Sequence, residues 1–135
     1  MSDATRTRSH AVTAAAAFAL DAALVVLFAA IGRASHTEEV LVGLWMTAWP
    51  FLAALVIGWL VTVAWRAPAA PVGTGLGVWA ITVAGGILLR AASGQGTAFA
   101  FIIVATLSLL VLLVVWRIAA AVVRRVGPAS GGPRQ

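Results

Sequence analysis

The sequence predicts an all-α integral membrane protein, a four-helix up-down bundle with both termini in the cytoplasm. Composition gives the first indication. Hydrophobic residues make up 62% of the 135 residues, charged residues only 10%, and the mean hydropathy is +1.05. Soluble domains carry roughly 25% charged residues and about 45–50% apolar ones. This chain lacks the polar surface that a water-soluble globule needs, which excludes a soluble enzyme, a disordered tail and a secreted disulfide scaffold.

The spacing of the charges gives the second indication. Three charge-free windows, 40–65, 67–89 and 91–116, are each long enough for one crossing by a helix of about 20 apolar residues. A fourth apolar stretch, 11–32, is interrupted only by Asp21. A signal peptide would have a shorter apolar core of about 7–15 residues and no acid, so we predict a span there as well.

These windows define the expected organisation of the chain. We expect a transmembrane domain over 11–126, with spans at about 11–32, 40–65, 72–90 and 97–117. A cytoplasmic N-terminal tail over 1–10 and a disordered cytoplasmic tail over 127–135 flank this domain. The seven-residue spacing of Arg117 and Arg124 further suggests that the fourth helix continues past the membrane as a basic extension.

The arginines give the third indication, because they set the orientation. With four spans, one side holds Arg33 and Arg90 and the other holds seven arginines: Arg6, Arg8, Arg66, Arg117, Arg124, Arg125 and Arg134. This positive-inside bias places both termini in the cytoplasm of a multi-pass plasma membrane protein. The absence of Lys and the abundance of Ala, Gly and Val indicate a bacterial chain. The arginines flank apolar runs rather than forming one patch, so we expect no nucleic-acid partner.

Asp21 is the candidate intramembrane polar site. A carboxylate near a helix centre costs an estimated 2.5–3.5 kcal/mol on insertion scales. Counting about 1.5 Å per residue places Asp21 near the midplane, level with the hydroxyls of Thr82, Thr106 and Ser108. Because no cation is expected at that depth, we predict a protonated Asp21 that is hydrogen-bonded to at least one of these hydroxyls.

Other residues are assigned to packing or to the outer face. Gly85 and Gly86 would allow a close helix crossing, and Pro50 would kink the second span. The outer-face polar residues are Arg33, His36 and Arg90. An ion pair between Asp21 and Arg90 is the less favoured alternative, because Arg90 lies near the outer end of its helix.

The tryptophans fall into two sets. Trp65 and Trp116 lie at predicted cytoplasmic ends, where indole rings commonly anchor at the headgroup level. Another set forms a stripe with helical spacing on the second span, where it could pack together or line a cavity: Trp45, Trp49, Leu52, Val56 and Trp59. We favour packing for this stripe.

No catalytic or metal-binding motif is visible. There is no Cys, no Ser-His-Asp arrangement, no phosphate-binding glycine loop and no metal-ligand helix motif. His36, Glu38 and Glu39 lie close together in sequence, but their spacing fits a solvated loop better than a metal site. We therefore predict no enzyme activity, no cofactor and no metal.

Several of these residues together resemble a known family. They are Asp21, Phe28, Gly32-Arg33, His36, Trp49-Pro50-Phe51, Trp79, Thr82, Gly86, Arg90 and Trp116-Arg117. Over roughly residues 12–118 the chain resembles an uncharacterised family of small four-span bacterial and archaeal membrane proteins, a domain of unknown function. The resemblance implies the architecture and no activity. The chain also shares a general plan with small multidrug transporters, which carry a glutamate in the first helix, but their local motifs are not visible.

Three functions compete. The first is a non-enzymatic accessory or scaffold subunit, in which Asp21 holds helices together. The second is a small oligomeric transporter or proton-coupled permease, in which Asp21 binds a proton or cation and Arg33 or Arg90 guards the outer mouth. A lipid-acting membrane enzyme is the third and is disfavoured because no catalytic set is present. We favour the accessory role, with the lipid bilayer and either a second copy of the chain or another membrane protein as partners.

The predicted topology can be tested with single cysteines, because the chain has none of its own. An impermeant thiol reagent applied to intact cells should label Ser35→Cys and Ser93→Cys, which we place outside, and should leave Ser130→Cys unlabelled. Labelling at Ser130→Cys would refute the orientation inferred from the arginine bias.

Overall fold

The computed structural model describes residues 3–33 and 40–127, which form four long helices and no strand. The helices are α1 (Asp3–Arg33), α2 (Val40–Val61), α3 (Gly77–Ala92) and α4 (Phe99–Val126). Between α2 and α3 lie a 3-10 turn, Ala64–Arg66, and a π-helical turn, Pro71–Leu76. All four helices, with α3 extended by the π-helical turn, are long and apolar enough to cross a membrane. The predicted all-α four-helix membrane bundle is confirmed.

The terminal helices are longer than the expected spans. α1 begins at Asp3, so most of the predicted N-terminal tail is helical. Asp3 in the first turn suits the positive end of the helix dipole, and adding residues to a helix that is already formed costs less than nucleating one. α4 continues to Val126 and carries Arg124 and Arg125 in its last turn, whereas Arg117, which was expected on the same basic face as Arg124, is fully buried. The predicted disordered tail, apart from Gly127, lies outside the described residues.

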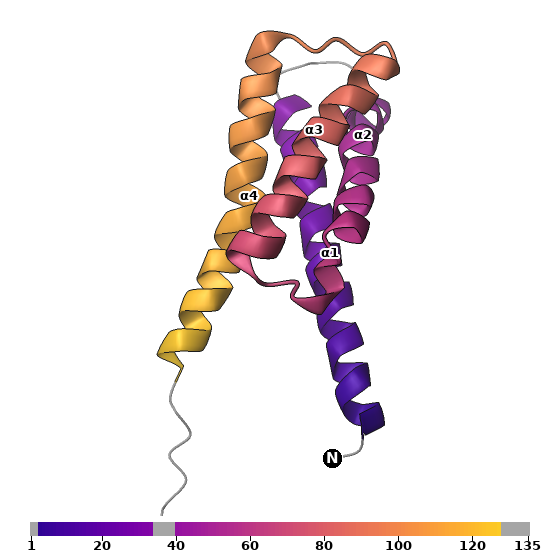
Figure 1. Ribbon diagram of the computed structural model, residues 1–135. Coiled ribbons are helices and arrows are strands. Elements are labelled where there is room, and N and C mark those ends of the chain that lie inside the picture. Colours follow the sequence, from indigo (N-terminus) through magenta and orange to yellow (C-terminus); the bar gives the residue numbers. More distant parts are fainter. Residues whose placement is uncertain (1–2, 34–39, 128–135) are drawn as a thin grey trace, which may run out of the picture.

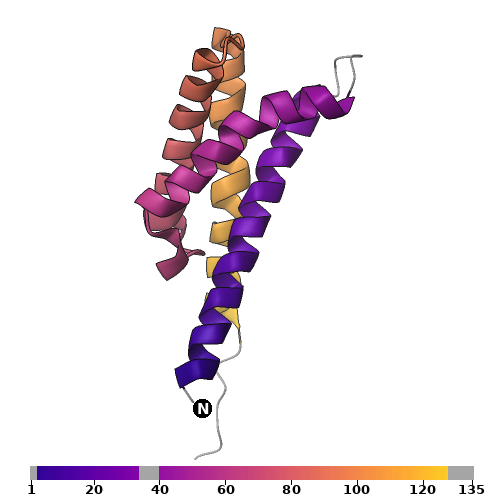
Figure 2. The ribbon, with the colours of Figure 1, turned by 90° about the vertical axis from the view of Figure 1, so that its right-hand side faces the viewer.

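The four helices run alternately up and down (Figure 1). The start of α1, the end of α4 and the connection between α2 and α3 lie toward the same end of the bundle, which we call the terminal end. There α1 and α4 continue past the connecting segment, residues 64–70, and move apart (Figure 1). α2 crosses α1 obliquely (Figure 2). The terminal end is therefore more open than the packed middle of the bundle.

Two glycines explain how α2 and α3 approach so closely. A Cβ atom built on Gly86 would overlap the ring of Phe51, and one built on Gly85 would lie 2.9 Å from the Cβ of Ala54. Small residues of this kind let helix backbones approach in a membrane. The predicted close crossing at Gly85 and Gly86 is present, and its partner is α2.

Pro50 lies inside α2, fully buried, and the helix is continuous through it. Proline cannot donate to the carbonyl four residues earlier, so one rung of the hydrogen-bond ladder is missing there. Bends in helices commonly occur at such positions, and α2 changes direction along its length (Figure 2). Pro50 also lies next to Phe51, which fills the space over Gly86.

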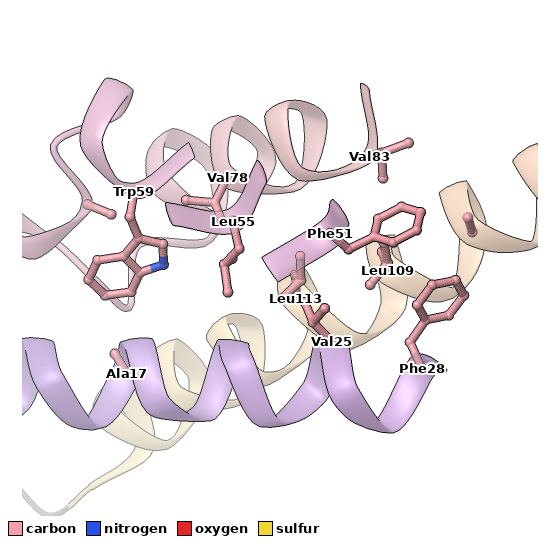
Figure 3. Close-up of a cluster of buried hydrophobic side chains, with 12 residues drawn as sticks. Ala17, Val25, Phe28, Phe51, Leu55, Trp59, Val78, Val83, Leu109 and Leu113 are labelled. Atoms are coloured by element: carbon pink, nitrogen blue, oxygen red, sulfur yellow. The ribbon is translucent and has the colours of Figure 1, made fainter. Parts of the chain in front are cut away.

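The apolar core lies between all four helices. Figure 3 shows side chains of α1, α2, α3 and α4 packed together, with Phe28 beside Phe51 at one end and Trp59 over α1 at the other. The inward face of α2 carries Phe51, Leu55 and Trp59, at four-residue spacing. The predicted tryptophan stripe is therefore divided: Trp59 is buried, whereas Trp45 is 62% exposed on the outer surface of the bundle.

The glycine contact predicts a specific destabilisation. Gly86→Leu must displace Phe51 and should lower the thermal unfolding midpoint in detergent, because overpacking typically costs about 1–3 kcal/mol. Gly73→Leu is the matched control, since no atom lies within 4 Å of a Cβ at that position. Equal midpoints for the two variants would contradict the close-packing interpretation.

Candidate functional site

The Asp21 carboxylate is held in an ion pair with Arg117, and both side chains are 0% exposed. Nη2 of Arg117 donates to Oδ2 of Asp21 at 2.6 Å, and Nη1 donates to Oδ1 at 2.9 Å. Two indoles complete the shell: Nε1 of Trp59 donates to Oδ2 and Nε1 of Trp116 donates to Oδ1, each at 2.9 Å. The pair thus joins α1, α2 and α4 at one point.

Arg117 uses its remaining capacity to hold the connecting segment. Its Nε donates to the carbonyl oxygen of Pro68 at 2.9 Å, and its Nη1 also donates to the carbonyl oxygen of Leu113, one turn earlier in α4. The guanidinium carbon lies 4.4 Å from the centroid of the Trp116 ring, a distance suited to a cation–π contact. All three nitrogens of this guanidinium therefore have hydrogen-bond acceptors from the chain itself.

The connecting segment is shaped to receive the Arg117 side chain. Val63 takes a left-handed conformation (φ 51°), which a β-branched residue rarely adopts, and it turns the chain at the end of α2. Thr74 Oγ1 donates to the carbonyl oxygen of Ala67 at 2.7 Å and ties the segment to the π-helical turn. A Cβ on Gly75 would lie 3.0 Å from Cδ of Arg117, so the glycine leaves room for the arginine stem.

The predicted hydroxyl cage around Asp21 is wrong. The side chains that bind the carboxylate are the two indoles and Arg117, and Thr82, Thr106 and Ser108 are not among them. Thr106 Oγ1 donates instead to the carbonyl oxygen of Ile102 in its own helix. Thr82 Oγ1 is buried and has no hydrogen-bond partner among the described residues.

The hydrogen bonds also argue against the predicted protonated Asp21. An indole N–H and a guanidinium can only donate hydrogen bonds, and a carboxylate offers about four acceptor positions on its two oxygens. Two donors approach each oxygen of Asp21, so these positions are filled. A proton on either oxygen would point at a donor. The arrangement fits an ionised Asp21.

The error came from the assumed depth of Asp21. The expectation counted from Ala11 as the start of the first span, whereas the first part of α1 continues past the connecting segment at the terminal end (Figure 1). Asp21 consequently lies level with Trp59, near the end of α2, and with Arg117, at the end of the predicted fourth span. The acid is toward the terminal end of the bundle. This position also makes Trp116 a ligand of Asp21 rather than only an interfacial anchor.

The predicted outer-face residues take local roles. Nε of Arg90 donates to the carbonyl oxygen of Gly96 and Nη1 donates to Gln95, each at 2.9 Å. The Arg90 guanidinium also stacks on the Phe101 ring, with its central carbon 4.4 Å from the centroid. Arg90 therefore closes the turn between α3 and α4 and does not pair with Asp21.

Arg33 reaches α2 at the same end of the bundle. Its guanidinium fills the space over Gly43, and Nη1 approaches Oγ1 of Thr47 at 3.5 Å. His36 lies outside the described residues. Within the part of the chain that the structure describes, no three His, Asp or Glu side chains gather as a metal site would require.

Arg117 and Trp59 are the site residues that sequence reasoning missed. Arg117 stands at the end of an apolar run, where the positive-inside rule already explains an arginine. Its position therefore did not indicate that it pairs with Asp21. One signal was present: Trp116-Arg117 and Asp21 both belong to the set of residues that carries the family resemblance. Trp59 was assigned to packing, because an indole on an apolar helix face packs far more often than it binds an acid.

Comparison with known proteins gives one match. A family described as "Protein of unknown function (DUF3054)" matches residues 18–120, which include Asp21, Trp59, Trp116 and Arg117. The same range leaves out most of the helical extensions at both termini. Searches of curated proteins and of solved structures found no match to the chain.

Breaking the ion pair from either side should be costly. Asp21→Asn leaves the buried Arg117 without a counter-charge, and Arg117→Met leaves the buried carboxylate, so each variant should lose about 3–5 kcal/mol of stability. The combined variant Asp21→Leu/Arg117→Met buries no charge. It should lose less than the sum of the two single losses, although two indole N–H groups lose their acceptor.

Thermal unfolding of the purified chain in detergent measures these differences. Arg125→Met is the control, because it removes an exposed arginine from the same helix and should change stability by no more than about 0.5 kcal/mol. If Asp21→Asn unfolded at the wild-type temperature, the ion pair would not support the bundle in the way the geometry indicates.

Proposed function

Because the chain belongs to the DUF3054 family, whose function is unknown, we propose its function from the ion pair. The chain is a non-enzymatic accessory or scaffold subunit of a protein assembly in the membrane. In this role Asp21 and Arg117 lock three helices and the connecting segment into one rigid unit. Polar groups inside membrane proteins commonly serve either as such ties between helices or as binding sites.

One observation carries the proposal: the acceptor positions of Asp21 are filled by donors of the same chain. A proton or cation carrier needs an acid that releases and rebinds its cargo. Freeing Asp21 would leave the fully buried Arg117 uncompensated, at a cost of about 3–5 kcal/mol. Asp21 is fully buried and does not line the hollow bounded by Arg66 and Arg124 or the one bounded by Leu20 and Trp116. Both facts support a structural role.

The orientation and location form part of the proposal. The start of α1 and the end of α4 lie toward one end of the bundle (Figure 1). Most of the described arginines belong to these segments and to the turn between α2 and α3: Arg6, Arg8, Arg66, Arg124 and Arg125. The positive-inside rule then favours termini in the cytoplasm and a location in the plasma membrane. The partners are the lipid bilayer and either a second copy of the chain or another membrane protein. The apolar outer surface of the helices contacts these partners, and the chain has no nucleic-acid partner.

A small oligomeric transporter or proton-coupled permease is the alternative. The buried charges favour it, because ionisable residues within membrane spans often mark ion or proton pathways. The Thr82 hydroxyl is a second polar group in the core, because it is buried without a hydrogen-bond partner among the described residues. In a transporter, exchange of the Arg117 contact for a proton would free Asp21 during the cycle.

Proton flux into liposomes separates the two functions. Under an imposed pH gradient, liposomes containing the wild-type chain should be no more permeable to protons than protein-free liposomes, because the ion pair stays closed. Asp21→Leu/Arg117→Met is the matched variant and should behave in the same way. Proton flux that depends on the wild-type chain and disappears in the folded double variant would overturn the accessory role and favour the permease.

Native mass spectrometry tests the scaffold role directly. The chain extracted from its own membrane in a mild detergent should appear in a complex of fixed stoichiometry, with itself or with another membrane protein. A spectrum that contained only the isolated 13.8 kDa chain would contradict the proposal.

A further inference from the structure

A basic pocket opens at the terminal end of the bundle, where α1 and α4 move apart. It has a volume of about 330 Å³ and is lined from three directions. His10 and Thr13 come from α1, Arg66 comes from the connecting segment, and Arg124 comes from α4. Three side chains with basic nitrogen atoms thus line one hollow, although Arg66 and Arg124 are 56 and 114 residues from His10 in sequence (66 − 10 and 124 − 10).

The positive charge of this pocket is not compensated by the described residues. Its lining contains no carboxylate. In the described part of the chain the acids are Asp3 and Asp21, and the acceptor positions of Asp21 are already filled. Nε of Arg124 makes only a 3.3 Å hydrogen bond to a carbonyl of its own helix. An anion that entered the pocket would meet two guanidinium groups, which are well suited to bind phosphate oxygens.

An apolar groove continues directly from the pocket. It has a volume of about 380 Å³, and Thr13, Pro68 and Ala69 line both hollows. Val12, Ala16, Leu20 and Trp116 complete the groove with apolar surface. From His10 to Leu20 the two hollows follow about 15 Å of α1 at 1.5 Å per residue, which is close to half of a 30 Å hydrocarbon core.

We propose that the basic pocket and the apolar groove together bind one phospholipid with a net negative headgroup. Arg66 and Arg124 contact the phosphate, and an acyl chain lies along Ala16 and Leu20 against Trp116. Charge selects an anionic lipid over a zwitterionic one, because the amine of a zwitterionic headgroup would be repelled by the same arginines. The lipid is the stated occupant, since a free anion would leave the apolar groove uncovered.

The site is joined to the ion pair through Trp116. One part of this residue lines the apolar groove, and its Nε1 donates to Asp21. Pro68 also lines both hollows, and its carbonyl oxygen accepts from Arg117. A bound lipid therefore covers the two groups that surround the Asp21–Arg117 pair, and lipid binding should raise the thermal stability of the bundle.

Lipid titration of the full-length chain in detergent, followed by native mass spectrometry, tests the proposal. Phosphatidylglycerol should bind at one site, at least tenfold more tightly than phosphatidylcholine with the same acyl chains. Arg66→Gln/Arg124→Gln should weaken phosphatidylglycerol binding roughly 25-fold, because each arginine near an anionic headgroup contributes a factor of about five. Arg125→Gln is the matched control, since Arg125 does not line the pocket, and should change the affinity less than twofold.

The apolar groove has its own variant. Ala16→Phe fills the groove and should weaken phosphatidylglycerol binding, whereas Ala15→Phe, at an exposed neighbour outside the groove, should not. Unfolding temperatures without added lipid establish that each variant is folded. Equal affinity for the two lipids, or an unchanged affinity in Arg66→Gln/Arg124→Gln, would overturn the proposal. So would competition by inorganic phosphate or glycerol 3-phosphate at the lipid's own concentration, because the site would then bind a free anion only.

Discussion

A charge removed from water inside a membrane protein must find a partner in the protein, and this constraint organises the structure. Asp21 meets it with Arg117, and two indole N–H groups complete the hydrogen-bond shell. Removing either charge alone would leave the other buried and unpaired, which is far more costly than burying neither. α1, α2 and α4 are therefore joined at one point near the terminal end. A small change at this point alters the packing of all three helices.

The ion pair also explains features of the chain that have no obvious purpose in isolation. The chain turns sharply at Val63, just before the connecting segment, and the carbonyl oxygen of Pro68 accepts from Arg117. Gly75 stays small because the arginine stem passes beside it. In the middle of the bundle the contact is steric instead: Gly85 and Gly86 leave room for Ala54 and Phe51, so α2 and α3 approach closely. The bundle is thus fixed electrostatically at one end and by close packing in the middle.

The same arrangement connects structure with function. A carboxylate whose acceptor positions are filled is a poor site for an exchanging cargo, and this favours a structural subunit over a permease. The surface next to the ion pair is different. There the ends of α1 and α4 separate and leave a basic pocket that continues into an apolar groove, both in contact with residues that bind the pair. The buried charges stabilise the fold, while the exposed charges beside them are available to a ligand from the membrane.

Composition and charge spacing by themselves determined that the chain is a four-helix membrane protein, because apolar length and arginine placement act through the bilayer and need no tertiary contact. The sequence also marked Gly86 as a packing position and Asp21 as the exceptional residue. Only the tertiary structure decided the partner of Asp21. The relative height and crossing angle of helices depend on side-chain packing between segments far apart in sequence, which a count of residues along one helix does not contain. Asp21 binds Arg117, 96 positions away, and not Thr106 or Ser108, which lie 11 and 9 residues before Arg117 in the same helix.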